Sequence, residues 1–402
     1  MRNTKRFASL AAVAMLGLLA AACGSDSKSS STTAPSTGAT TAPGGTTAPG
    51  GTTAPDGTTA PADTTGSAGT AAAGSGPKVG LVYDIGGRGD QSFNDSAARG
   101  VERAKSELGI TFTEASPNAD GSNRKELLDL AAQSSDIVIA VGFLFEPDAA
   151  TVGKSNPTKT FGVIDSPMLD TTADPTGKTP YGPNIAGLVF SEEQGSFLVG
   201  AAAALKSTSG QIGFIGGVKG VGGLIEKFEA GYIAGAKAAN PDIKVVSKYI
   251  TEAPDFDGFN APDQARDIAT TMYDGGADVV YSAAGGSGAG VFEAAKATSD
   301  TKGSKVWAIG VDSDQYNTAD PAVKDFILTS MLKHVDVAVF EIIKAQMDGN
   351  VKGGPTRYDL SVDGVGYSTS GGFIDDIVSK LDAYKADIIS GKIVVPTDPT
   401  KA

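Results

Sequence analysis

Two residue types that support much of enzyme chemistry are almost absent from this chain of 402 residues. It contains one cysteine, Cys23, and one histidine, His334. A single cysteine excludes an intramolecular disulfide bond. A Ser–His or Cys–His nucleophilic site would have to use His334, and no G-x-S-x-G turn accompanies it. The sequence also lacks a cluster of metal-ligand residues, so we expect neither a metal nor another cofactor.

Basic residues are outnumbered by acidic ones, 33 to 46, which gives a net charge of −13 at pH 7. Proteins that bind nucleic acid present a basic face, so we expect no nucleic acid partner. The same charge argues against electrostatic adhesion to anionic lipid head groups. These exclusions leave small molecules and other proteins as the partners to consider.

The N-terminus has the pattern of an export signal. Residues 1–22 begin with a basic segment and continue as an apolar run that ends in small residues. A transmembrane anchor is the alternative, although the run is short for a span and lacks a charged stop behind it. Cys23 follows Leu-Ala-Ala-Ala and resembles the lipobox of bacterial lipoproteins, with Ala20 where leucine is more usual. That resemblance implies lipidation of Cys23 and attachment to the extracytoplasmic face of the cell membrane.

The segment that follows, residues 23–77, cannot bury a hydrophobic core. It consists mainly of Ser, Thr, Ala, Gly and Pro, and the motif TTAPGG occurs twice in succession, at 40–45 and 46–51. Such a composition is typical of disordered segments. We interpret it as a tether that holds a globular part away from a membrane or carries it through a cell-wall layer.

From Lys78 onward, short apolar runs alternate with helical patterns. Lys78 to Tyr83 has the composition of a buried strand, and a helical repeat follows the polar turn at 85–91. The order of strand, glycine-rich turn and helix returns at residue 211, and Ser191 to Gln194 has the form of a helix capping box. Repeated β–α units predict parallel sheets covered by helices, and roughly 325 residues exceed what one core usually holds. We therefore expect two doubly wound α/β lobes.

Three aspartates stand at the ends of predicted strands, namely Asp84, Asp165 and Asp312. In open α/β sheets, ligands bind beyond the carboxyl ends of the strands, so we expect these side chains to face one cleft. Phe93 and Asn94, at the start of the first helix, would lie at the same edge. Carboxylates accept hydrogen bonds from hydroxyls and an aromatic ring stacks on a flat base. This lining suits a neutral, planar, hydroxyl-rich ligand.

The sequence leaves a structural explanation open for each of these residues. An aspartate can cap a helix or solvate a loop, and Phe93 can cover the start of its helix. Tyr281 is either a second stacking surface or a core residue. Lys333 follows an apolar strand, so it either extends to solvent or reaches ligand oxygens, because an unpaired buried ammonium would be costly.

Several motifs in register point to one family. The segment from Asp84 to Asn94 is similar to the pattern D-x-G-G-x-x-D-x-S-F-N of the basic membrane protein (BMP) family, which comprises bacterial substrate-binding lipoproteins of the purine nucleoside receptor type. The other segments that match this family in order are EQGSFLVG at 193–200, FEAGY at 228–232, NPD at 240–242, AGGSG at 284–288, GVDSD at 310–314 and TSMLK at 329–333. The similarity extends from about Lys78 to the C-terminus.

The resemblance implies a type I periplasmic-binding-protein fold, in which two lobes close on a ligand about a hinge. The first lobe is expected to comprise residues 78–189 and 324–349, and the second residues 190–323 and 350–402. No catalytic step is implied. The expected partners are a purine nucleoside and an ABC permease, and we expect a monomer.

Carried over residue by residue, the resemblance predicts a ligand site composed of Asp84, Ser92, Phe93, Asn94, Asp165, Tyr281, Gly285, Gly286, Asp312 and Lys333. Phe93 would stack on the purine, while Asp84, Asn94 and Asp165 would hold the base or neighbouring polar atoms. Tyr281 lies near the position of a second aromatic residue in the family.

The same resemblance implies that Asp312 and Lys333 bind the ribose hydroxyls, with the Gly285-Gly286 turn close by. Two rival functions remain open at this point. One is a nucleoside hydrolase that acts in the same cleft, which turnover of inosine would reveal. The other is a sensor that presents a ligand-dependent surface to a signalling partner, and neighbouring permease and ATPase genes would argue against it.

Overall fold

The computed structural model describes residues 76–402. The predicted signal segment, the lipidation site at Cys23 and the tether up to residue 75 lie outside the described residues. Among the residues described, none of the helices combines the length and apolar character that crossing a membrane requires.

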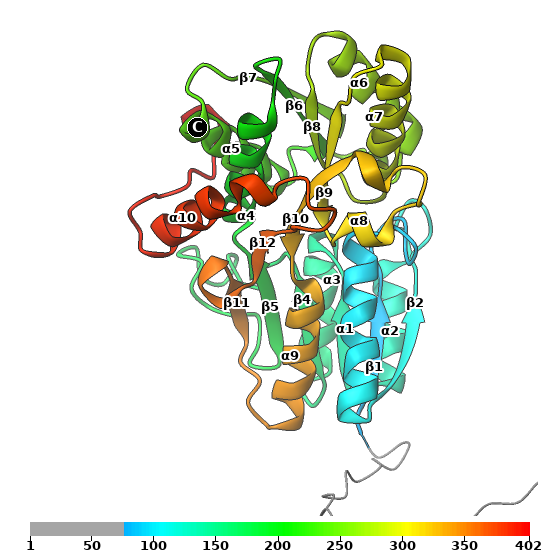
Figure 1. Ribbon diagram of the computed structural model, residues 1–402. Helices are drawn as coiled ribbons and strands as arrows, with labels where there is room; N and C mark the ends of the chain where they lie inside the picture. Colours follow the sequence, from blue (N-terminus) through cyan, green and yellow to red (C-terminus); the bar gives the residue numbers. More distant parts are fainter. Residues whose placement is uncertain (1–75) are drawn as a thin grey trace, which may run out of the picture. The chain divides into compact units, whose positions relative to one another are not determined.

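The first of two six-stranded sheets is entirely parallel. Its strands, in spatial order, are β11 (Gly354–Tyr358), β5 (Ile185–Phe190), β4 (Thr160–Ile164), β3 (Ile137–Ala140), β1 (Lys78–Val82) and β2 (Thr111–Ala115). The helices of this lobe are α1 (Phe93–Leu108), α2 (Arg124–Ser134), α3 (Glu146–Ser155) and α9 (Val335–Met347). In Figure 1, α1 and α9 lie side by side on one face of the sheet.

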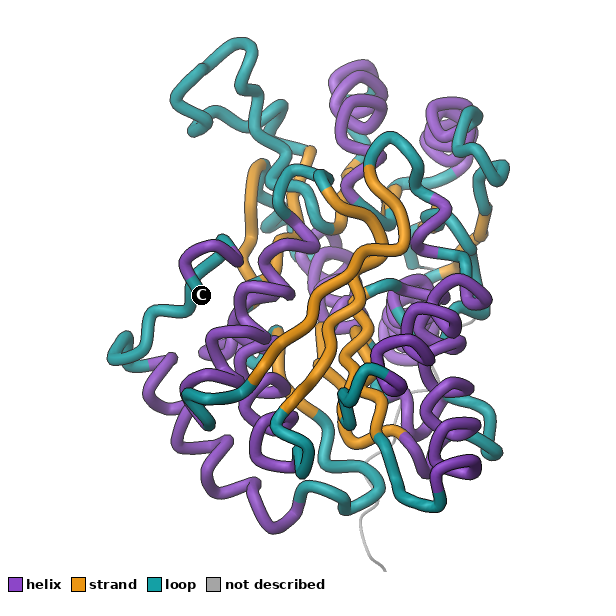
Figure 2. The backbone as a smooth tube through the Cα atoms, turned by 90° about the horizontal axis from the view of Figure 1, so that it is seen from above, coloured by secondary structure: helices purple, strands orange, loops and turns teal. Residues whose placement is uncertain are grey.

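The second sheet repeats this arrangement. Its strands, in order, are β12 (Val365–Tyr367), β10 (Ile327–Lys333), β9 (Trp307–Asp312), β8 (Val279–Ala283), β6 (Gln211–Lys219) and β7 (Lys244–Glu252). β12 pairs with β10 in the antiparallel sense, and the other described pairings are parallel. The helices of this lobe are α4 (Glu192–Lys206), α5 (Leu224–Ala239), α6 (Pro262–Asp274), α7 (Gly288–Lys302), α8 (Gln315–Thr318) and α10 (Val378–Ile389). Figure 2 shows strands running between helices on both sides.

The sheets are buried on both faces, which explains the continuous apolar runs in the sequence. All four residues of β3 are buried, as are all five of β4 and of β8. On the outer face, α1 packs against α9 at Gly100, where a Cβ would lie 2.7 Å from the carbonyl oxygen of Asp336. The prediction of two doubly wound parallel-sheet lobes is confirmed.

The chain crosses between the lobes three times, and the crossings differ from the expected boundaries. They fall at Ser191 between β5 and α4, at His334 between β10 and α9, and at Asp359 after β11. The assignment of 324–349 to the first lobe is therefore wrong for β10, which pairs with β9. The assignment of 350–402 to the second lobe is wrong for β11, which pairs with β5. A strand and the helix that follows it usually belong to the same lobe. Here the crossings separate β5 from α4 and β10 from α9.

The structure also contains elements that the sequence pattern did not indicate. These include β2, β11 and β12, which are edge strands with partly exposed residues and so lack a continuous apolar run. The predicted capping box is absent, since the Ser191 side chain does not cap α4 and Gln194 instead accepts a hydrogen bond from the N–H of Leu360.

Candidate functional site

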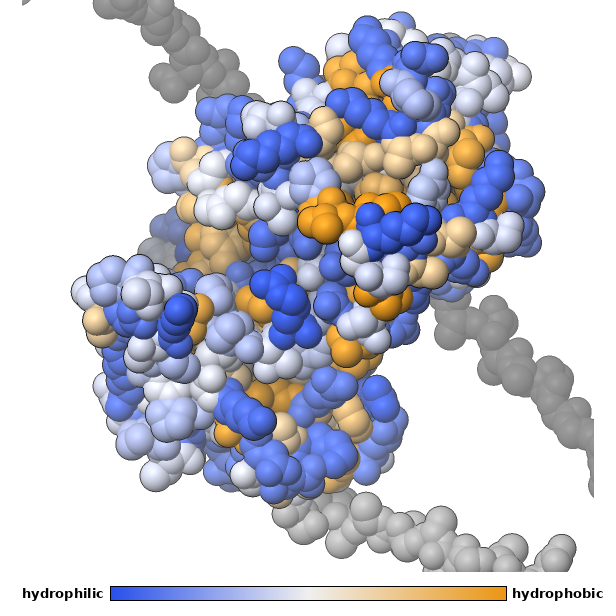
Figure 3. Space-filling model, turned by 90° about the vertical axis from the view of Figure 1, so that its left-hand side faces the viewer, coloured by the Kyte–Doolittle hydropathy of each residue, from blue (hydrophilic) through white to orange (hydrophobic). Residues whose placement is uncertain are grey.

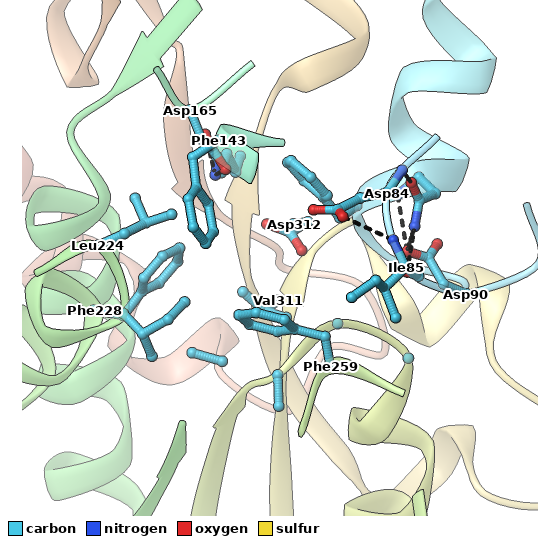
Figure 4. A pocket seen from close by; sticks show the side chains of 18 residues that line it. Asp84, Ile85, Asp90, Phe143, Asp165, Leu224, Phe228, Phe259, Val311 and Asp312 are labelled. Carbon is cyan, nitrogen blue, oxygen red and sulfur yellow. Dashed lines mark hydrogen bonds and ion pairs between the residues drawn. The ribbon is translucent and has the colours of Figure 1, made fainter. Parts of the chain in front are cut away.

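A cleft of about 580 Å³ lies where the carboxyl ends of the two sheets face each other. This volume includes space that is open to solvent at the mouth of the cleft. Residues of both lobes line it: Asp84, Ile85, Asp90, Phe93, Asn94, Phe143, Asp165, Leu224, Ile225, Phe228, Phe259, Ala283, Ala284, Gly285, Gly286, Val311, Asp312 and Lys333. Figure 4 shows Leu224 and Phe228 on one side and Asp84, Ile85 and Asp90 on the other.

Asp84 follows β1 and is fixed by the start of α1. Its N–H donates to Oδ1 of Asn94 at 2.9 Å, and its own Oδ1 accepts from the N–H of Ile85 at 2.8 Å. Opposite it, Gly142 has φ of 107°, and a Cβ there would lie 2.2 Å from Oδ2 of Asp84. Glycine is therefore required at position 142 for Asp84 to occupy its place.

Asp90 caps the start of helix α1 with its side chain. Its carboxylate accepts hydrogen bonds from the N–H groups of Ser92, Asn94 and Asp95 at 2.8–3.1 Å. These are donors that the first turn of a helix leaves free. Asp90 lines the cleft, yet its carboxylate is largely occupied by the backbone.

Lys333, at the end of β10, is 2 % exposed and forms an ion pair across the lobes. Its Nζ lies 2.7 Å from the Asp165 carboxylate and 3.7 Å from Oε1 of Glu192. The other oxygen of Glu192, Oε2, lies 3.4 Å from Nζ of Lys227. Burial alone would lower the pKa of Lys333, but the carboxylates of Asp165, Glu192 and Asp312 raise it overall. Lys333 therefore does not extend to solvent, and its charge remains in the cleft.

Asp165 and Asp312 occupy equivalent places after β4 and at the end of β9 and share an unusual backbone conformation. Their φ angles are 64° and 63°, in the left-handed region that non-glycine residues seldom adopt. Such conformations are common at ligand sites, where the surrounding structure maintains them. Burial raises the pKa of the Asp312 carboxyl to about 6, while nearby Lys333 and the hydrogen bond from Ser92 oppose that rise.

Aromatic rings form much of the remaining wall. Phe93 begins α1, Phe143 follows β3, and Phe228 on α5 and Phe259 come from the second lobe. The Nζ of Lys333 lies 4.9 Å from the centre of the Phe93 ring. The cleft thus combines flat apolar surfaces with a charged group at their border.

The structure brings together eight of the ten residues predicted for the site. Asp84, Phe93, Asn94, Asp165, Gly285, Gly286, Asp312 and Lys333 all line the cleft. Ser92 lies behind it, fully buried, and its Oγ donates to Oδ2 of Asp312 at 2.7 Å and to the carbonyl oxygen of Val311 at 3.1 Å. Tyr281 is a core residue: it is fully buried, and its ring packs 5.2 Å from that of Tyr232.

Ten lining residues were not among the predicted set. Four of these carry a charged or aromatic side chain, and three of the four had a signal in the sequence. Phe228 belongs to the FEAGY motif, and Asp90 to the same motif as Phe93. Phe143 follows the end of a strand, as the aspartates do. For Phe259 the sequence offers no such signal, because it belongs to a short turn between β7 and α6.

Comparison with known proteins identifies relatives over the whole described region. The model of the Bmp family, described as ABC transporter substrate-binding protein PnrA-like, matches residues 77–399. The chain is 34% identical over 337 residues to the CD4+ T-cell-stimulating antigen of Listeria monocytogenes, a match that covers 80% of this chain and 88% of that protein. It is also 34% identical over 336 residues to the ABC transporter nucleoside-binding protein BmpA of Lactococcus lactis. That match covers 80% of this chain and 89% of BmpA.

A solved structure supports the same relationship. The crystal structure of ABC transporter system solute-binding proteins from Aeropyrum pernix superimposes with a TM-score of 0.66 at 27% identity, covering 80% of this chain and 94% of that one. Together with the two parallel-sheet lobes, this similarity confirms the predicted type I periplasmic-binding-protein fold.

Proposed function

Because this chain belongs to the Bmp family of PnrA-like ABC transporter substrate-binding proteins, we propose that it captures purine nucleosides in the inter-lobe cleft and delivers them to an ABC permease. The family is one of binding proteins, so catalysis is not part of this function. Its relative in Lactococcus lactis is named as a nucleoside-binding protein, and that name motivates the choice of ligand class.

The observation that supports the proposal is that an aromatic surface and a charged pair lie next to each other in the cleft. Phe93 offers a ring face, and Lys333 with Asp165 stands at its margin. A nucleoside has the same division, with a planar base on one side and ribose hydroxyls on the other. The ammonium donates to ribose oxygens and Asp312 accepts from the hydroxyls, so the sugar is placed at this charged end.

The base occupies the aromatic part of the cleft in this arrangement. Phe93 and Phe228 contribute ring surface from opposite lobes, and Asn94 and Asp84 lie at the edge where a base presents its polar atoms. Aromatic pairing adds about 0.5–1.5 kcal/mol beyond the burial of area. Binding thereby uses both lobes, which favours the closed arrangement when the ligand is present.

Calorimetric titration tests this proposal directly. Inosine, guanosine, adenosine and free ribose are titrated into the purified protein, and we expect at least one nucleoside to bind far more tightly than millimolar, the level that corresponds to about −4 kcal/mol. Phe93→Ala should weaken a nucleoside more than it weakens ribose. Phe112→Ala, which removes a ring outside the cleft, serves as the matched control. Absence of nucleoside binding to the wild type contradicts the proposal.

We further propose that lipid on Cys23 holds the protein at the extracytoplasmic face of the cell membrane. The support is the lipobox-like segment before this residue. Two or more acyl chains suffice for stable anchoring without a spanning helix. In cells, Cys23→Ser should move the protein from the membrane fraction to the soluble fraction and abolish labelling with a fatty acid. A variant that remains in the membrane fraction would contradict lipid anchoring.

A further inference from the structure

Three carboxylates of the first lobe line the cleft, and they differ in how much of each is already engaged. Asp90 accepts three backbone hydrogen bonds, and Asp165 is paired with Lys333. Asp84 accepts from Ile85 through Oδ1, whereas its Oδ2 accepts no hydrogen bond from any described residue. Asp84 thus keeps an oxygen available for a ligand in the cleft that Phe93 also lines, and Asn94 holds the Asp84 backbone through its N–H.

Arg124, at the start of α2, lies behind Asp84 and outside the lining of the cleft. Its Nη2 is 3.8 Å from Oδ1 of Asp84, and the two side chains are 13% and 11% exposed. Within the described residues, Nε and Nη2 of Arg124 are buried without a hydrogen-bond partner, and Nη1 makes one long bond of 3.4 Å to Gly121. Gly121 has φ of 65°, and a Cβ there would lie 2.2 Å from the guanidinium. The local backbone therefore accommodates a cation whose ion-pair partner is Asp84.

We propose that the Arg124–Asp84 pair makes the site selective for 6-oxopurine nucleosides, such as inosine and guanosine, over adenosine. This rests on the proposed function, since it requires a base against Phe93. A 6-oxopurine carries a hydrogen at N1 and is a donor there, whereas N1 of adenine is an acceptor. An ionised carboxylate only accepts hydrogen bonds, and a protonated one also donates. The charge of Asp84 therefore determines whether N1 of the base finds a complementary partner there.

Among the groups around Asp84, Arg124 is the cation that favours its ionised form. The pKa of Asp84 is raised to about 6, chiefly by burial, and the carboxylates of Asp165 and Asp90 contribute to this rise. The hydrogen bond from the Ile85 N–H and the charge of Arg124 act in the opposite direction. Arg124 is therefore a positioning residue that acts through Asp84. Its removal moves the titration of Asp84 towards neutral pH.

The test is the ratio of inosine to adenosine affinity, measured by calorimetry on the full chain between pH 5 and pH 8. For the wild type, we expect the ratio to fall at least tenfold as the pH decreases through about 6. In Arg124→Met the midpoint of this fall moves to higher pH, and Arg124→Lys restores it in part. Asp84→Asn abolishes the pH dependence of the ratio. Arg266→Met, which removes a surface cation of the second lobe, is the control for net charge.

The ratio of inosine to adenosine affinity distinguishes the selectivity of the site from its ability to bind nucleosides at all. Residues that bind the ribose, including Asp312, contribute equally to the affinity for both nucleosides, so their contribution cancels in the ratio. If neither nucleoside binds at any pH, the proposed function fails. If both bind with a ratio that does not change with pH, the function stands and the selectivity is refuted. If the affinity ratio of Arg124→Met falls at the same pH as that of the wild type, the role of Arg124 is refuted. If Arg124→Met does not fold, Asp84→Asn decides: a ratio that still depends on pH as in the wild type refutes the proposal.

Discussion

The two lobes share one strand order but contribute different chemistry to the cleft. Most polar lining residues come from the first lobe, at the end of β1, the start of α1 and the end of β4. The second lobe contributes mainly apolar and glycine residues, namely Leu224, Ile225, Phe228, Phe259, Ala283, Ala284, Gly285, Gly286 and Val311, together with Asp312 and Lys333. One wall therefore offers mainly hydrogen-bonding groups, whereas the other offers mainly apolar surface.

The exception to this division lies at the two equivalent aspartates. Asp165 of the first lobe pairs with Lys333 of the second, and Asp312 of the second accepts from Ser92 of the first. Each left-handed aspartate is thus held by a side chain from the opposite lobe. Because both contacts join the two lobes, we expect closure of the lobes to complete the polar part of the site.

The exterior contrasts with this interior. On the face drawn in Figure 3, hydrophilic residues predominate and hydrophobic ones occur in small patches. Scattered apolar residues of this kind are normal for a monomer and do not by themselves mark an interface. The expected monomeric state stays a prediction, which light scattering of the purified protein would check.

The largest effect is expected from Lys333→Met. This change leaves Asp165 and Glu192 buried without the cation they share, and breaking a buried pair in this way costs about 3–5 kcal/mol. We expect the free energy of unfolding to fall by about that amount and nucleoside binding to decrease more than 100-fold. Urea denaturation and calorimetry measure the two effects. Lys344→Met, an exposed lysine of α9, is the control, and equal behaviour of the two variants would contradict the central role of Lys333.

Asp312→Asn tests the second aspartate through pH. The raised pKa of Asp312, about 6 against an ordinary 3.8, means that the folded state binds this proton more tightly than the unfolded state. The associated stability is present below pH 3.8 and is lost as the pH rises through about 6. The free energy of unfolding of the variant relative to the wild type should therefore increase by about 3 kcal/mol between pH 4 and pH 7.5. If the difference in free energy of unfolding between the variant and the wild type does not change with pH, the raised pKa of Asp312 is refuted.

The sequence predicted the parts of the site that follow from strand ends. Asp84, Asp165 and Asp312 were identifiable because an acid after a buried apolar run is unusual, and parallel strands bring such positions to one edge. Phe143 escaped prediction for the complementary reason. A phenylalanine after an apolar strand looks like a continuation of the core, so the pattern alone does not distinguish a lining ring from a buried one.

Other outcomes depended on tertiary contacts that no local pattern contains. Ser92 and Phe93 are adjacent on the chain, but the first faces Asp312 behind the cleft and the second faces the cavity. Tyr281 lies in a strand whose five residues are all buried, and only the packing against Tyr232 assigns it to the core. The lobe boundary after β10 likewise depends on pairing with β9, which the sequence of β10 does not reveal.

A smaller effect is expected from Gly231→Ala, which tests the apolar wall. Helices α4 and α5 approach so closely that a Cβ at Gly231 would lie 2.1 Å from the carbonyl oxygen of Glu193. Overpacking of this kind costs about 1–3 kcal/mol and would displace Phe228 on the same helix. We expect lower stability and weaker binding of nucleosides by calorimetry. Gly366→Ala, where a Cβ meets no atom within 4 Å, is the control, and comparable losses in both variants would contradict this mechanism.

The smallest effect is expected from Ser92→Ala, which removes the hydrogen bond that Asp312 accepts from the opposite lobe. In the open arrangement water can replace the Ser92 hydroxyl at Asp312, so the loss applies to the closed form alone and amounts to about 1–1.5 kcal/mol. The closed population and the nucleoside affinity should each decrease about tenfold, while the stability of the separate lobes is retained. Small-angle scattering with and without ligand reports the closure, and Ser106→Ala on the exposed side of α1 is the control. If Ser92→Ala closes and binds as the wild type does, closure depends on the Lys333–Asp165 pair and the ligand, and the two aspartates are not equivalent in function.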